Sequence, residues 1–483
     1  MKLKLLLLAL ATFLFELPVM SQAVGRIECP TNDDFEDESV YPLGNKGLLV
    51  QTRSKDADDG KRTVKSELYS TDMKLLRTET FSIPKKMTDE CSDYVDGVNY
   101  SVWRDRDDNL KVLAFDTKTN KTSVYNAMLK SKFSIRWPSF GSGCMVFAST
   151  DKKTETLNIF NLASGQIKVL NLHFPGVKDR NTLIFATAIV KDNVLAFVNV
   201  EGHTMLVRTD MDGNMVGVTE ITPADGEAIT SASISDTGGR IFVTGTYTKS
   251  KKGNSQGIYF AALDNGEFAF YKSYNFLDLK NFTEFMSEKK QKKIERKKEK
   301  AEKKDKEYAL NYLMASHDIV FDGKDYYYLG EAYYPTYITY RQGNAIITSF
   351  NGYQYTHAVL VKFNAQGDLL WDTCFPMFPK NRPYSVVHFA SMGLDKGNVS
   401  LVYADRMKLV SKIVALNDGN VIQEKEAEII EAGDENLNVK KMKAPTTSYW
   451  YDNNYIVYGQ QYVKDKTGGN RRKVFGITKY TID

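Results

Sequence analysis

The sequence predicts an all-β protein built from about eight copies of a four-stranded antiparallel unit. A short apolar strand recurs eight times along the 483 residues, and each copy follows a turn of Asp, Asn or Gly. A second strand comes after each copy, and most of these end in another such turn. Aromatic residues make up 12% of the chain, and aromatic side chains favour strands. Repeats of about 45–60 residues that each form a small sheet are typical of β-propeller blades.

The first strand of the repeated pair is short and apolar. It occupies residues 47–52, 99–105, 143–150, 194–200, 240–247, 325–334, 398–405 and 454–462. Preceding turns such as Asp96-Gly97 and Asp452-Asn453 contain residues that tolerate the positive φ values of tight hairpins.

The second strand of the pair ends in a similar turn in most units, and a further strand then follows. It occupies residues 66–73, 110–117, 156–163, 205–212, 257–264, 358–365, 411–418 and 473–480. Each unit is therefore strand, tight turn, strand, variable loop, strand, tight turn, strand. Period-2 alternation between regular turns excludes a helical solenoid.

The last unit indicates how the ring closes. It ends at Asp483, just after its third strand. We expect residues 24–29 to supply the missing fourth strand, because pairing the two ends of the chain removes two exposed sheet edges. The alternative is seven blades with an extra hairpin.

The N-terminus has the pattern of a signal peptide. Lys2 and Lys4 precede an apolar run from Leu5 to Phe15, and Ser21-Gln22-Ala23 supplies small residues for cleavage. The apolar run is too short to span a bilayer comfortably, although an uncleaved anchor is the alternative. We therefore expect a signal peptide over 1–23, a propeller domain over 24–483 without a transmembrane segment, and a periplasmic or extracellular location.

Four cysteines allow three disulfide pairings in an exported protein. Cys144 and Cys374 fall inside strand-like runs, which predicts buried thiols. Cys29 with Cys91 is the more plausible bridge. The irregular spacings give no metal-binding signature.

The basic charge is concentrated in one insertion, residues 277–312. Residues 288–307 hold 11 Lys or Arg and 6 Asp or Glu, a local charge of +5, so the net +4 leaves −1 for the remainder. Nucleic-acid binding is not expected without a broad basic face. Residues 284–306 predict a helix with i,i+4 ion pairs. The helix is either an arm for an acidic partner or membrane surface, or a solvated rod that its own ion pairs stabilise.

Strand parity predicts that all long connections lie on one face of the disc. The loops between second and third strands (248–256, 335–356 and 463–472) and the connection 277–312 share this face, whereas tight turns occupy the other. Long loops on a rigid scaffold often carry function.

Two groups of side chains on that face are candidate sites. The first is an aromatic cluster suited to a sugar or a peptide, unless it only packs its own loop. Its candidate ligand-binding residues are Tyr333, Tyr334, Tyr337, Tyr340, Arg341, Tyr353, Tyr355 and His357. The second is a set of polar residues expected at the mouth of the central channel. The alternative is that these residues are polar only because the strand ends face water. The members of the set are Arg104, Asp105, Glu201, His203, Glu331, Asp405, Arg406 and Gln460.

Motifs for metal binding or nucleotide binding are absent. The sequence has no H-E-x-x-H, P-loop or dinucleotide fingerprint, and residues 140–144, which lie in a hairpin turn, are not a G-x-S-x-G nucleophile elbow, so we expect no metal and no cofactor and name no catalytic residue. We expect a non-enzymatic binding or scaffolding propeller for a glycan, peptide or protein partner, as a monomer or as part of an envelope complex. The alternative is a hydrolase or lyase acting on glycans through Glu331, Asp405, Arg406 and His203.

One segment carries a family resemblance. The run VKFNAQGDLLWDTCF at 361–375 resembles the repeat of secreted bacterial propellers, and residues 321–375 are similar to uncharacterised exported proteins of the Bacteroidota. The resemblance implies an exported propeller and no particular activity.

Overall fold

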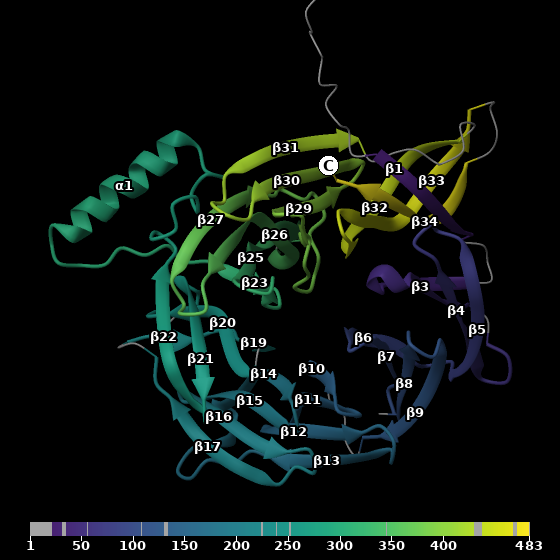
Figure 1. The fold of residues 1–483 in the computed structure, drawn as a ribbon, viewed down its shortest axis with the longest axis horizontal. Coiled ribbons are helices and arrows are strands. Elements are labelled where there is room, and N and C mark those ends of the chain that lie inside the picture. The colour runs from purple at the N-terminus through teal and green to yellow at the C-terminus, as the bar shows by residue number, and fades with distance from the viewer. Residues whose placement is uncertain are drawn as a thin grey trace, which may run out of the picture.

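The computed structural model describes residues 22–30, 35–55, 57–107, 109–129, 134–223, 226–237, 239–250, 253–343, 345–428, 437–466 and 471–482. The predicted signal peptide therefore lies outside the described residues, apart from Gln22 and Ala23 at the start of the first strand. The described residues form eight sheets arranged in a ring (Figure 1). The predicted eight-bladed propeller is confirmed, and the seven-bladed alternative is wrong.

The first four sheets, blades 1 to 4, each consist of four consecutive strands. Blade 1 is β2 (Phe35–Pro42), β3 (Leu48–Ser54), β4 (Lys61–Tyr69) and β5 (Leu75–Pro84), with the short helix η1 (Gly44–Lys46) between its first two strands. Blade 2 is β6 (Thr88–Val95), β7 (Val98–Arg104), β8 (Asn109–Asp116) and β9 (Lys121–Met128). Blade 3 is β10 (Arg136–Gly141), β11 (Cys144–Asp151), β12 (Thr154–Asn161) and β13 (Gln166–Asn171). After η2 (Asp179–Asn181), blade 4 is β14 (Thr182–Val190), β15 (Asn193–Val200), β16 (His203–Asp210) and β17 (Met215–Ile221).

In blades 5 and 6 the first position is divided between two short strands. Blade 5 is β18 (Ala228–Ile229), β19 (Ser233–Thr237), β20 (Arg240–Thr248), β21 (Gly257–Asp264) and β22 (Glu267–Asn275). Blade 6 is β23 (Leu313–Ser316), β24 (Val320–Phe321), β25 (Tyr326–Gln342), β26 (Ala345–Phe363) and β27 (Leu369–Pro376). Blade 7 is β28 (Ser391–Asp395), β29 (Asn398–Asp405), β30 (Lys408–Ala415) and β31 (Val421–Glu428). Blade 8 is β32 (Leu437–Tyr451), β33 (Asn454–Asp465), β34 (Arg472–Thr481) and β1 (Gln22–Pro30).

Each blade runs from the axis of the ring to its rim. The first strand is innermost and the last strand is outermost, as Figure 1 shows for β6 to β9 and for β14 to β17. The repeated strand pair of the sequence therefore occupies the two middle positions of every blade. Apolar clusters between neighbouring blades hold the ring together; one cluster joins Leu195 and Phe197 of blade 4 to Val243 and Tyr259 of blade 5.

The two ends of the chain close the ring as predicted. Strand β1 pairs antiparallel with β34, and Ile27 lies opposite Ile477. Ile27 and Ile477 also belong to one apolar cluster with Leu48 and Val50 of blade 1. The N-terminal strand therefore completes blade 8 and contributes to its junction with blade 1.

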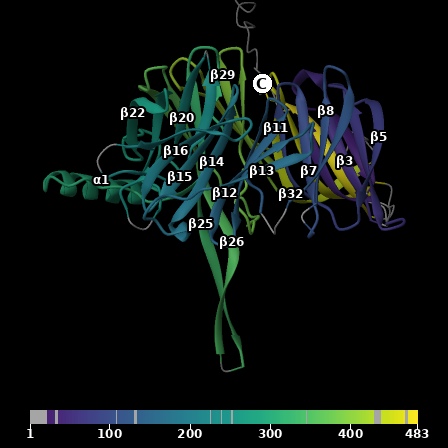
Figure 2. The same cartoon turned by 90° about the horizontal axis from the view of Figure 1, so that it is seen from below.

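The long connections share one face, which we call the loop-bearing face, and the tight turns share the other, which we call the turn face. Figure 2 shows β25 and β26 extending beyond the disc as a two-stranded ribbon. The base of the insertion lies beside the neighbouring loop between β20 and β21: Ser255 pairs with Tyr312, and Lys249 forms a 2.8 Å ion pair with Glu307. The predicted placement of these connections on a common face is confirmed.

The insertion contains the predicted helix in a shorter form. Helix α1 (Glu288–Glu302) extends from the side of the disc and buries no residue (Figure 1). The preceding residues do not join the helix, because Phe285 packs on the disc by stacking on His357. One predicted ion pair, Glu288 with Lys292, is present at 3.9 Å.

The cysteines do not form the predicted Cys29–Cys91 disulfide, and all four are unbridged. Cys29 lies on β1 in the cluster between blades 8 and 1. Cys91 lies on β6 and packs against a cluster that joins blades 2 and 3. Blade 1 therefore separates the two thiols, which sequence spacing alone does not reveal. Among the described residues, no helix is long and apolar enough to span a bilayer.

Candidate functional site

The most prominent feature of the loop-bearing face is a hairpin ribbon, Thr336–Gln342 of β25 with Ala345–Phe350 of β26. The sequence predicts a loop here, but the two strands remain paired beyond a register shift between Pro335 and Tyr337, with Tyr337 opposite Phe350 and Tyr340 opposite Ile347. β-Branched and aromatic residues favour this pairing. Both faces of the ribbon are open, because it leaves the disc (Figure 2).

The ribbon exposes large apolar side chains. The exposed fractions are 61% for Tyr337, 47% for Ile338, 47% for Tyr340 and 68% for Ile346. Arg341 is also exposed, and Tyr334 lies exposed just below the ribbon. Of the eight predicted ligand-binding residues, the four that can meet an external partner most freely are therefore Tyr334, Tyr337, Tyr340 and Arg341.

The aromatic residues at the base of the ribbon pack into the disc instead. Tyr355 is fully buried, and its ring lies 5.3 Å from that of Tyr333 and 4.8 Å from that of Phe389. Its hydroxyl donates to Val387 O at 2.6 Å and accepts from Val387 N at 3.0 Å. Tyr333 and Tyr353 are half-buried in edge contact with each other. Tyr355 therefore anchors the chain entering blade 7 and is not part of an exposed platform.

His357, predicted as a ligand-binding residue, is also buried. Its ring stacks on Phe285 at 3.8 Å and makes edge contacts with Phe282 and Tyr312. Thr356 Oγ1 lies 3.0 Å from Nδ1, whereas Nε2 is buried without a hydrogen-bond partner. Burial lowers the pKa of His357 to about 3, so the ring is neutral near pH 7. It secures the base of the insertion to the disc.

The eight predicted channel-mouth residues do not converge. Seven of them lie on second strands or on the turns that follow, whereas His203 begins the third strand β16, and the set is spread over blades 2, 4, 6, 7 and 8. Several pair locally: Arg104 with Glu90 at 3.3 Å, and His203 with Glu220 of outer strand β17 at 2.7 Å.

The other members of this set also serve their own loops. Asp105 accepts hydrogen bonds from Asp107 N, Asn109 N and Asn109 Nδ2; Glu201 accepts from Asn181; and Asp405 accepts from Lys380 N. Arg406 is exposed at a turn, and Gln460 is half-buried on β33. The ends of the second strands therefore do not form one polar funnel.

Glu331 is the exception, because it lies in a buried polar cluster. Its carboxylate accepts hydrogen bonds from Phe389 N at 3.0 Å and Ala390 N at 2.9 Å, and lies 2.7 Å from His317 Nε2. His317 in turn stacks on His388 at 3.9 Å. Glu331 therefore links blade 6 to the start of blade 7, and these contacts occupy the carboxylate on several sides.

Sequence reasoning missed the carboxylates near this cluster. Asp318 follows His317 in the break between β23 and β24, and Asp93 lies on β6, the inner strand of the opposite blade. Burial raises the pKa of Asp93 to about 6, and the negative charge of Asp318 adds to this shift. Asp93 can thus exchange a proton near neutral pH. A search of the first strands, which line the axis, would have found it.

Among the described residues, no three or more His, Cys, Asp or Glu side chains are grouped to hold a metal ion.

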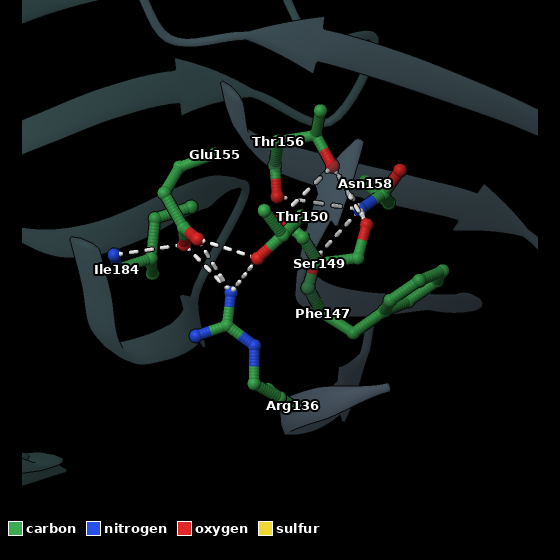
Figure 3. Close-up of polar contacts among 8 residues, drawn as sticks. All are labelled: Arg136, Phe147, Ser149, Thr150, Glu155, Thr156, Asn158 and Ile184. Atoms are coloured by element: carbon green, nitrogen blue, oxygen red, sulfur yellow. Dashed lines mark hydrogen bonds and ion pairs between the residues drawn. The ribbon is translucent and has the colours of Figure 1, made fainter. Parts of the chain in front are cut away.

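A second buried polar cluster performs a similar task between blades 3 and 4 (Figure 3). Arg136 lies 2.7 Å from Glu155, which also accepts from Thr150 Oγ1 at 2.7 Å and from Ile184 N at 3.1 Å. Ile184 belongs to the inner strand of the next blade, so Glu155 links two blades as Glu331 does.

A shallow hollow of about 270 Å³ lies beside this cluster, at the loop-bearing end of the inner strands. It is lined by Arg136, Trp137, Leu183, Ile184 and Phe185. Trp137 is 52% exposed and has a φ of 52°, an unusual conformation for a large side chain. An exposed indole can stack on a planar or apolar ligand. Trp137 is not among the predicted site residues, because it lies on the first strand of blade 3, outside the long loops and the ends of the second strands.

The described residues define an eight-bladed β-propeller that carries a protruding ribbon on one face. No protein-family model and no curated protein sequence matches this chain. Among solved structures, the chain is similar to the Dos1 propeller, with 11% identity and a TM-score of 0.41 over 95% of each chain. It is similar to dihydro-heme d1 dehydrogenase NirN at 9% identity and a TM-score of 0.45, over 96% of this chain and 83% of that one. AztD from Citrobacter koseri has 10% identity and a TM-score of 0.36, over 92% and 97%. Such similarities concern the fold and not the function.

Proposed function

We propose that the protein is an exported binding or scaffolding propeller whose protein partner docks on the hairpin ribbon. The observation that carries the proposal is the ribbon itself, which presents Tyr337, Ile338, Tyr340 and Ile346 to solvent well beyond the disc. By the register of the hairpin, Tyr337 and Ile346 lie on one face of the ribbon and Ile338 and Tyr340 on the other, and exposed apolar side chains gathered in this way mark interaction sites in soluble proteins. The eight blades supply the rigid base that holds it.

The backbone of the ribbon supports a protein partner. Strand β23 pairs with β25 only as far as Tyr333, and β27 pairs with β26 only from His357. Each strand of the ribbon therefore has one edge with unpaired N–H and C=O groups, which a strand of another chain can extend.

The side chains of the ribbon favour a protein over a glycan. From Thr336 to Phe350 the only charged residue is Arg341. Exposed edge strands usually carry charges that prevent pairing, and this ribbon has almost none. Ile338 and Ile346 offer no hydrogen bonds to sugar hydroxyls, whereas they can pack against the apolar side chains of a partner.

The test removes the ribbon without disturbing the disc. Replacing residues 338–349 with Asn-Gly keeps the pair Tyr337–Phe350 and closes it with a two-residue turn. Partners captured with the full-length protein are purified, and their affinities for both forms are measured by calorimetry. We expect the truncation to weaken binding about 100-fold, and Tyr340→Thr with Ile346→Thr to weaken it about tenfold.

The conservative variant Thr339→Ser in the same ribbon is the control and should bind normally. Unchanged affinity after truncation would refute the proposal. Binding to a glycan array that depends on the ribbon would identify a glycan ligand instead of a protein.

A further inference from the structure

A second candidate site lies on the turn face, away from the ribbon. A cavity of about 530 Å³ opens between blades 4 and 5. Its rim comes from three tight turns, represented by Lys191, Gly239 and Asn265, and its floor includes Leu195 and Leu206. Cavities of this size accommodate small organic ligands.

Arg208 lies in this cavity without a partner. It extends from β16, opposite Gly217 of β17, and its guanidinium makes no hydrogen bond or ion pair with any described residue. Its Nε is buried and unpaired. A buried donor without an acceptor destabilises the folded protein, so an acceptor supplied by a ligand would be favourable.

Two glycines make room for the guanidinium. A Cβ atom at Gly266 would lie 2.7 Å from Arg208 Cζ, and one at Gly217 would lie 3.0 Å from Nη2. Any side chain at Gly266 would displace the guanidinium. At the corresponding turn one blade earlier, Gly213 lies against the stem of Lys168, which comes from the outer strand β13. Arg208 comes from the third strand and lies deeper between the blades.

The charge and the floor of the cavity define the ligand. Lys191 adds a second cation, and Asp264 is already paired with Arg240 at 3.2 Å. The charged residues that line the cavity, Arg208, Lys191 and Asp264, sum to +1, and Arg240 outside the lining neutralises Asp264, so the site favours an anion. Leu195, Leu206 and Leu263 are almost fully buried beneath.

We propose that this cavity binds an organic carboxylate with an apolar body. The carboxylate accepts a pair of hydrogen bonds from Arg208, and the body packs on the leucine floor. The carboxylate can belong to a free aliphatic or aromatic acid, or to the C-terminus of a peptide with an apolar last residue. This site is independent of the ribbon.

The test titrates the full-length protein with hexanoate, benzoate and a short peptide ending in Leu, and follows methyl NMR signals of Ile241 and the cavity leucines. The amides hexanamide, benzamide and the amidated peptide are the matched neutral ligands, and inorganic phosphate tests for a general anion site. We expect saturable shifts with at least one carboxylate at concentrations up to about 10 mM. Binding should be about tenfold weaker for the matching amide and for Arg208→Gln.

Lys168→Gln is the control variant, and its affinity should equal that of the unmodified protein. Gly266→Ala is a second test at the cavity, to be used if Arg208→Gln does not fold. It should also weaken binding, because the added methyl group would displace the guanidinium of Arg208. If the free acids bind more tightly than the peptide, the ligand of this cavity is a small molecule. If the peptide binds more tightly, the ligand is the C-terminus of a peptide chain. Absence of saturable binding, equal affinity for acid and amide, preference for phosphate, or retained affinity in Arg208→Gln would overturn the proposal.

Discussion

Acidification should destabilise the protein at one identifiable side chain, His357. The ring is enclosed by Phe282, Phe285 and Tyr312, and its Nε2 has no partner. A proton on this ring would place a positive charge in an apolar cage at the base of the insertion.

The size of the effect follows from the two pKa values of His357. Burial lowers the pKa from 6.5 to about 3 in the folded protein. The unfolded chain therefore takes up the proton first, and stability that is present above pH 6.5 is lost as the pH falls towards 3. Between about pH 7.5 and pH 5 this one group should cost about 2 kcal/mol.

Two measurements check this value. In an NMR titration of labelled histidine, the His357 ring signal, assigned with His357→Phe, should not titrate above about pH 4. In urea unfolding, the unmodified protein should lose about 2 kcal/mol more than His357→Phe over the same pH range. His203→Asn, at an exposed histidine, should behave like the unmodified protein. A His357 pKa above about 5.5 would refute the reasoning.

Four further substitutions, one of them a control, test the contacts between blades and the closure of the ring. Glu331→Ala removes the acceptor of two buried backbone N–H groups and should cost about 3 kcal/mol in thermal unfolding, whereas an unchanged melting temperature would contradict its role as a link. Gly419→Ala should cost about 2 kcal/mol or more, because its Cβ would lie 2.7 Å from the Trp371 ring at a φ of 73°. Gly397→Ala, with φ 87° and nothing within 4 Å, should cost only about 1 kcal/mol, and equal costs would contradict the packing argument. Ile27→Asp should open the ring at β1, and light scattering should show aggregation at a lower temperature; an unaltered onset would mean that β1 does not protect the edge of β34.

Much of the fold was predictable because its signals are local. A strand shows in alternate apolar residues, and a tight turn shows in Asp, Asn and Gly. The count of repeats then gave eight blades, and the missing last strand indicated the pairing that joins Ile27 to Ile477.

The candidate site was harder to predict, because burial depends on neighbours far along the chain. Tyr337 and Tyr355 look alike in the sequence, yet Tyr337 stands on the open ribbon and Tyr355 is buried against Phe389. His357 is enclosed by an insertion that precedes it by about 70 residues. Asp93 and Asp318 influence each other only because their blades lie opposite one another.

The sequence by itself determined the strands, the number of blades, the strand that closes the ring and the common face of the long connections. These features follow from the two-residue period of strands and from backbone preferences of turn residues, which act over a few positions. Only the tertiary structure decided that the tyrosine-rich stretch stands out as a ribbon, that Glu331 is buried between blades, and that Arg208 lies unpaired in a cavity. Those outcomes depend on which surfaces meet when eight sheets pack in a ring, and no local pattern encodes that meeting.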